Sequence, residues 1–179
     1  MFVFLILGVA GLAALYVVGS QETRLDIARG LASGGRVRVR FTGYWPGAAR
    51  TEAERRMEGG LNDRKGRPLH TLEQHLSDPS RHPYVSLAGD DAVWPYGQRV
   101  TLPGFPSVVA RVVDTGSNFR GAGKAVRVLA HEPIDVCVSG PGSLERYIPR
   151  TGEITIVPGD NFEGGRAVAM ARATPGSAA

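Results

Sequence analysis

The sequence predicts an all-β domain, a small closed barrel of six short strands that follows an apolar amino-terminal segment. The 179 residues leave room for one domain with appendages. They include 24 Gly and 12 Pro, which favour short strands and turns over long helices. Short apolar or alternating runs occur in six separate places, with wide loops between them. Closing six such strands into a barrel removes the exposed sheet edges that an open sheet would leave.

The amino-terminal segment, residues 1–19, carries no charged side chain and is rich in Phe, Val, Leu, Ile and Ala. As a helix it would span about 27 Å, close to the thickness of the hydrocarbon core of a bilayer. Two interpretations of residues 1–22 stay open. We favour an uncleaved transmembrane anchor, because no Lys or Arg precedes the run; the alternative is a signal peptide cut near Gly19. Several arginines follow the run and would by the positive-inside rule keep that side cytoplasmic, so the sequence leaves the orientation open.

Residues 23–35 are expected to form a stalk or linker, with helix possible over 23–32 and a break at Ser33-Gly34-Gly35. The barrel domain is expected at 36–158. It begins with a strictly alternating strand in which Val37, Val39 and Phe41 point inward and three arginines point outward. Residues 159–179 are expected to form a flexible or partly helical tail.

The remaining strands are predicted from short apolar runs bounded by Gly, Pro, Asn or Asp. We expect them at 84–87, 99–102, 107–113, 134–138 and 153–157. Residues 43–66 read as a long loop, and 71–76 as one or two turns of helix.

Composition and residue spacing narrow the functional class. The net charge of +4, from 21 Lys+Arg and 17 Asp+Glu, fits an ordinary basic surface or one suited to an anionic polymer such as cell-wall glycan. The sequence has no run of basic residues interleaved with aromatic residues, which is the pattern that would predict nucleic-acid binding. The single cysteine, Cys137, cannot form an intrachain disulfide, and its place between two valines predicts a buried thiol. The four histidines lack metal-ligand spacing, and we expect them at the surface, with no metal and no cofactor.

Three aspartates, Asp90, Asp114 and Asp135, each lie where a predicted strand meets a turn. Carboxylates at the ends of apolar strands are costly unless they are paired, hydrated or used. Each could simply cap a strand end or an Asx turn. Three of them in one small domain predict a site. The aromatic residues Tyr44, Trp45, Trp94 and Tyr96 could stack on sugar rings, with core packing as the alternative for each, and Glu58 could add a carboxylate.

The three aspartates and their flanking residues resemble the 3D (three-aspartate) domain of membrane-bound lytic transglycosylase A and of bacterial and phage muralytic proteins. The resemblance covers 36–157, about two thirds of the chain. The matching pieces, in chain order, are Phe41-Thr-Gly-Tyr44-Trp45-Pro46, Glu58-Gly-Gly60, Asp63, Gly66-Arg-Pro68-Leu69, Val85-Ser-Leu-Ala-Gly-Asp90, Pro95-Tyr-Gly97, Asp114-Thr-Gly116, Phe119-Arg-Gly121 and Ile134-Asp135-Val136.

The resemblance implies a double-psi β-barrel and cleavage of peptidoglycan glycan strands by one aspartate that acts as both acid and base. In such a reaction the 6-hydroxyl of the sugar closes a 1,6-anhydro ring. Asp135 matches the family's acid/base, Asp114 would raise its pKa and orient it, and Asp90 would brace a turn. One departure is the interval between the last two aspartates, 135 − 114 = 21 residues here against about a dozen in the family, so an insertion near 123–132 must loop out.

The expected location is the bacterial envelope, on its periplasmic face, or a virion membrane, with residues 1–19 in the bilayer. Two other functions fit the same residues. One is a non-catalytic module that binds glycan or builds an envelope or virion. The other is a glycoside hydrolase that uses water, as most enzymes with two carboxylates do.

Overall fold

The computed structural model describes residues 24–48, 51–52, 60–116, 119, 131–140 and 142–162. All six predicted strands are present, with ends that differ from the expected ones by up to three residues. They are β1 (Gly35–Tyr44), β2 (Val85–Ala88), β3 (Gln98–Leu102), β4 (Phe105–Asp114), β5 (Pro133–Cys137) and β6 (Thr151–Ile156). The predicted helical turns form α3 (Leu72–Ser77), and two 3-10 turns occupy η1 (Pro46–Ala48) and η3 (Leu144–Arg146).

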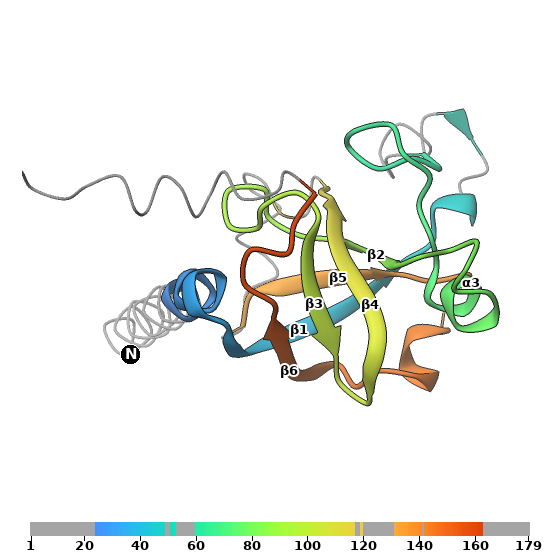
Figure 1. Ribbon diagram of the computed structural model, residues 1–179. Helices are drawn as coiled ribbons and strands as arrows, with labels where there is room; N and C mark the ends of the chain where they lie inside the picture. Colours follow the sequence, from blue (N-terminus) through green and yellow to red (C-terminus); the bar gives the residue numbers. More distant parts are fainter. Residues whose placement is uncertain are drawn as a thin grey trace, which may run out of the picture.

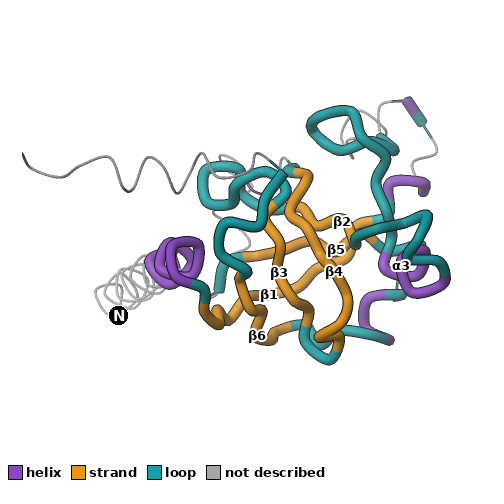
Figure 2. Tube along the Cα trace, in the orientation of Figure 1, coloured by secondary structure: helices purple, strands orange, loops and turns teal. Residues whose placement is uncertain are grey.

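The strands close into a mixed barrel in the order β1-β5-β2-β4-β3-β6 (Figures 1 and 2). Two pairs are parallel, β1 with β5 and β2 with β4, and the other four are antiparallel. Chain neighbours β1 and β2 do not pair with each other, so long connections cross the ends of the barrel. These connections carry the short helices and place the ends of distant strands side by side.

The barrel interior follows from the alternation seen in the sequence. Val37, Val39 and Phe41 of β1 point inward and are buried, as predicted. The other strands fill the same core with a layer of aliphatic side chains, namely Val85, Leu87, Val100, Leu102, Val108, Ala110, Val112, Ile134, Val136, Ile154 and Ile156. The outward positions of the same strands are therefore the ones available to build a site.

The segment expected as a stalk is a helix at 24–33 that packs against the barrel (Figure 1, blue). Ile27 is fully buried in the barrel core. A Cβ built on Gly30 would lie 2.6 Å from Ile156 Cδ1, so glycine permits the close approach to β6. Arg24 donates to Asp90 Oδ2 at 2.8 Å and lies 3.5 Å from Glu132 Oε2. The helix is thus part of the folded body, and the expected boundary at residue 36 lies too far along the chain.

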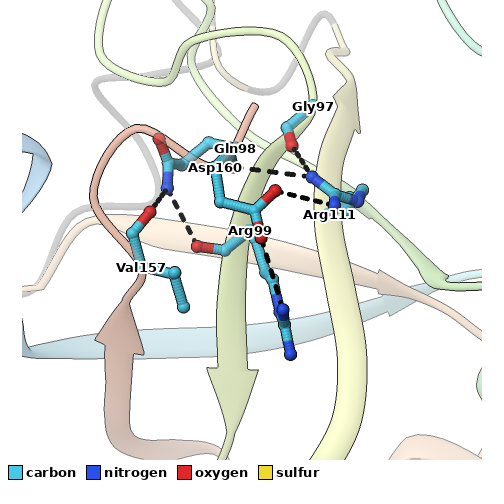
Figure 3. Close-up of polar contacts among 6 residues, drawn as sticks. All are labelled: Gly97, Gln98, Arg99, Arg111, Val157 and Asp160. Atoms are coloured by element: carbon cyan, nitrogen blue, oxygen red, sulfur yellow. Dashed lines mark hydrogen bonds and ion pairs between the residues drawn. The ribbon is translucent and has the colours of Figure 1, made fainter. Parts of the chain in front are cut away.

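The residues that follow β6 are also part of the fold as far as they are described. Asp160 lies between Arg99 of β3 and Arg111 of β4, at 3.3 Å and 2.8 Å, and Gln98 donates to Val157 O at 2.7 Å (Figure 3). Phe162 packs edge-on against the buried ring of Tyr84. Residues 159–162 are therefore fastened to the barrel, although we expected the tail to begin there; residues 163–179 lie outside the described part.

Among the described residues, no helix combines the length and apolar character needed to cross a membrane. The predicted anchor at 1–19 lies outside these residues.

Candidate functional site

Asp114 and Asp135 lie in one row across four neighbouring strands. The pairing register places Thr42 of β1 beside Asp135 of β5, Asp135 beside Ala88 of β2, and Ala88 beside Asp114 of β4. Register partners project from the same face of a sheet, so all four side chains point outward from the barrel on one side. Two strand spacings separate the aspartate Cα atoms by about 10 Å. Ala88, with only a methyl group, leaves the space between the two carboxyl groups open.

A β-bulge turns Asp114 to this face. Val112 pairs with Leu87, but Asp114 rather than Val113 pairs with Ala88. Without the extra residue, strict alternation would put Asp114 on the same face as Val112, inside the barrel. The bulge therefore moves a carboxyl group from the core side to the outer side. Val113 takes up a separate buried position beside Tyr84 and Tyr96.

The row forms part of the wall of a cleft of about 770 Å³, a volume within the usual range for small-molecule sites. Tyr44 and Trp45, both expected to bind substrate, line it and are half-buried. The cleft also takes residues from the loops that follow β4 and β5. Its lining comprises Arg40, Phe41, Thr42, Gly43, Tyr44, Trp45, Ala88, Asp114, Thr115, Gly116, Phe119, Asp135, Val138, Gly140, Gly142, Leu144, Glu145, Ile148 and Arg150.

The two carboxyl groups differ in their surroundings. Burial raises the pKa of Asp114, and the charge of Asp63 adds to the effect, while the Thr115 backbone N–H and Arg64 oppose it. The Thr115 N–H donates to Asp114 Oδ1 at 2.9 Å. Asp135 Oδ1 accepts a hydrogen bond from the Thr42 hydroxyl, which fixes the carboxyl group in the row. The cleft thus contains Asp114, whose carboxyl group holds its proton more tightly than usual, and Asp135, whose carboxyl group is held in place by Thr42 of the neighbouring strand.

Tyr44 supplies a neutral hydroxyl to the cleft. Burial raises its pKa well above the ordinary value, and the Cys137 thiol and the two aspartates add to this. Cys137, its register partner on β5, is fully buried as expected, and burial raises the pKa of its thiol to about 12. The thiol therefore stays protonated and is not a nucleophile.

Three of the predicted site residues lie elsewhere. Trp94 is 1% exposed in the barrel core, and Tyr96 is 4% exposed and donates to Asp63 Oδ2 at 2.5 Å, so neither offers a face to a sugar. Asp90 accepts from the Ala92 N–H at 3.0 Å and pairs with Arg24, which agrees with the bracing role expected for it. Glu58 lies outside the described residues.

The site also contains residues that the sequence analysis did not select. Thr42, Arg40, Phe119, Glu145 and Arg150 all line the cleft. The sequence signal was present for the first two, because Thr42 and Arg40 occupy the outward positions of the alternating strand that also carries Tyr44.

The histidines do not assemble a metal site. His70 and His82 approach at 3.1 Å between their Nδ1 atoms, and His75 is buried with Nδ1 2.6 Å from the His82 carbonyl oxygen, which corrects the expected surface position. Within the described part of the chain, no three His, Cys, Asp or Glu side chains gather closely enough to hold a metal ion.

In comparisons with known proteins, no family model matches this sequence and no curated protein is significantly similar to it.

Proposed function

We propose that the protein cleaves peptidoglycan glycan strands as a lytic transglycosylase, with Asp135 as the acid/base. The observation that carries the proposal is the row in which Asp135 and Asp114 flank Ala88 and open on one cleft lined by Tyr44 and Trp45. Two carboxyl groups on either side of a narrow gap are the arrangement that glycosidic-bond cleavage uses. Half-buried aromatic rings beside them suit the apolar faces of pyranose rings.

The chemistry needs one carboxyl group that gives a proton and takes it back. Asp135 protonates the glycosidic oxygen as the bond from that oxygen to C1 breaks and a positive charge develops on the sugar. The 6-hydroxyl oxygen of the same sugar then bonds to C1, and its proton passes to the Asp135 carboxylate. Bonds and protons balance, and no water is consumed. Asp114, whose burial favours its neutral form, limits the negative charge beside Asp135 and can donate a hydrogen bond to the sugar.

The finer features of the proposal rest on the resemblance to the 3D domain. They are the double-psi path of the chain through the barrel, the anchoring of residues 1–19 in a membrane, and the location in a bacterial envelope or virion. The closed six-stranded barrel with two parallel strand pairs is compatible with that path.

A glycan-binding or structural module on the same barrel is the main alternative. It would use the cleft and its aromatic residues but would not need two buried carboxyl groups. Asp114 and Asp135 are both buried in the wall of the cleft, which is costly for carboxyl groups and favours an enzyme over a binder.

The test is release of soluble fragments from purified peptidoglycan sacculi by the full-length chain. Wild-type protein should release fragments, and Asp135→Asn should lower the rate by at least about 10²-fold, the usual contribution of a positioned acid/base. Asp26→Asn, at an exposed position on the amino-terminal helix, is the matched control and should retain the wild-type rate. Binding of sacculi without release by the wild-type chain would support the binding module instead.

A further inference from the structure

We propose that Arg40 forms a carboxylate-binding subsite at one end of the cleft, so that the protein selects acidic glycans over neutral ones. The inference rests on the proposed function, because it assigns a feature of the substrate to a residue in the same cleft. It differs from that function in what it requires, since binding selectivity can be measured without cleavage.

Two of the three guanidinium nitrogen atoms of Arg40 are buried without a hydrogen-bond partner, although the residue as a whole is half-buried. Its Nε and Nη2 atoms are shielded from solvent and meet no hydrogen-bond acceptor among the described residues. Arginine stays charged at any physiological pH, so it cannot escape this cost by losing a proton. A buried donor that lacks an acceptor costs free energy, and one on a charged group costs more. Because Arg40 lines the cleft, an anionic ligand group could supply the missing acceptors.

The position of Arg40 relates it directly to the proposed reaction centre. Arg40, Thr42 and Tyr44 occupy successive outward positions of β1, about 7 Å apart from one to the next. Thr42 is the residue bonded to Asp135. A carboxylate held by Arg40 would therefore belong to a part of the ligand next to the group that lies over Asp135.

The two ends of the cleft differ in charge. Arg150, which also lines the cleft, is exposed one residue before Thr151, the β6 residue that pairs with Arg40, and adds a second positive charge. In the other direction along β1 lies a neutral hydroxyl group, Tyr44 Oη, which is buried and makes no hydrogen bond of ordinary geometry within the described residues. Hydroxyl groups of this kind suit the hydroxyl and amide groups of a neutral sugar. The cleft thus fits a ligand whose acidic part lies at the Arg40 end and whose neutral part lies at the Tyr44 end.

Arginine binds a carboxylate through two parallel N–H donors, and the free Nε and Nη2 edge of Arg40 is one such pair. In peptidoglycan the carboxylate can come from the lactyl group of the acidic sugar or from a peptide attached to that group. Both sources present the same chemistry to Arg40.

The experiment measures binding by calorimetry to the full-length chain carrying Asp135→Asn, which removes the proposed acid and so prevents turnover. Three ligands of equal sugar length are compared: an N-acetylglucosamine oligosaccharide, an alternating oligosaccharide with free lactyl carboxylates, and the same oligosaccharide with peptides attached. Arg40→Gln, added to this background, should weaken binding of an acidic ligand at least about tenfold and change binding of the neutral one less than about twofold. Arg38→Gln is the matched control, since Arg38 is an exposed arginine on the same strand and outside the cleft.

The results separate the subsite from the enzyme. Loss confined to the free lactyl ligand assigns the carboxylate to the sugar, and loss with the peptide-bearing ligand assigns it to the peptide; both support the subsite. Equal affinity of the Arg40→Gln protein and its parent for all three ligands, or equal loss for the neutral and acidic ones, would overturn it. Selective binding of acidic ligands by a wild-type chain that releases no fragments would support the subsite and contradict the proposed enzyme activity. Cleavage at the same rate with and without the Arg40 side chain would support the enzyme activity and contradict the subsite.

Discussion

Replacing Thr42 by Val removes the hydroxyl group that bonds to Asp135 and changes little else. The two side chains have nearly the same shape, and both are β-branched and suited to a strand. Thr42 is the register partner of Asp135 on the parallel pair β1/β5 and donates to its Oδ1. A hydrogen bond to a charged group contributes about 1.5–3 kcal/mol. If this bond orients the carboxyl group for reaction, its loss should lower kcat/KM by roughly 10- to 100-fold.

The assay is the rate of fragment release from sacculi by the full-length chain, with thermal unfolding as a check on the fold. Thr42→Ser keeps the hydroxyl and should retain most of the activity. Thr155→Val makes the same change on β6, outside the cleft, and should leave the rate unaltered. A Thr42→Val enzyme within about twofold of the wild-type rate would show that the orientation of Asp135 does not depend on this bond, and the reasoning would fail.

Three further predictions concern stability. Burial raises the pKa of Asp114 above its ordinary 3.8, so ionisation of this group destabilises the fold as pH rises from 3.8 through the higher folded pKa. Asp114→Asn should therefore raise the unfolding temperature relative to wild type at pH 7 and have a smaller effect at pH 3. Arg24→Gln should lower the free energy of unfolding, measured in urea, by about 3 kcal/mol, because the side chains of its partners Asp90 and Glu132 are each only 4% exposed. Arg29→Gln removes an exposed ion pair and should lower it by less than about 1 kcal/mol. Burial alone would raise the pKa of Asp160, but the hydrogen bonds and charges of Arg111 and Arg99 outweigh it and lower this pKa (Figure 3). The stabilising effect of Asp160 is therefore complete above pH 3.8 and is lost as pH falls through its folded pKa. Asp160→Asn should lower the free energy of unfolding at pH 7 and change it little near pH 2, and equal effects at both pH values would contradict this origin.

The strands and two of the three aspartates were accessible from the sequence because their signals are local. Alternation over 36–41 fixes which side chains of β1 enter the core, and the apolar runs elsewhere are long enough to identify strands. Asp114 ends β4 as expected, whereas Asp135 is the middle residue of β5 (Pro133–Cys137) and does not lie where a strand meets a turn. The resemblance then supplied their proposed roles.

The bulge at Asp114 could not be predicted in the same way. A bulge is a property of a strand pair, and the two successive valines Val112 and Val113 do not by themselves show where the alternation of β4 shifts. Only the pairing with β2 shows which face Asp114 occupies.

The predicted place in the site was wrong for two aromatic residues, and one arginine that lines the cleft was not predicted, because the burial of these side chains depends on the three-dimensional fold. Trp94 and Tyr96 lie close to Asp90 in sequence, but the chain turns them into apolar clusters away from the cleft. Arg40 has the same place in the alternation as Arg36 and Arg38, and its burial depends on elements far along the chain, since the cleft that it lines is completed by residues near η3. Distant segments that cover a position leave no mark in its local sequence.

The mass of the fragments released from sacculi tests the central claim most directly. If a sugar hydroxyl closes on C1 while Asp135 carries the proton, each fragment should end in a 1,6-anhydro sugar, lighter by one water molecule than the hydrolysis product. Its amount should fall with Asp135→Asn and stay unchanged with Asp26→Asn. Fragments that carry an ordinary reducing end would instead show that water attacks, as in a hydrolase, and undiminished release by Asp135→Asn would show that the row of carboxyl groups beside Ala88 is not the reaction centre.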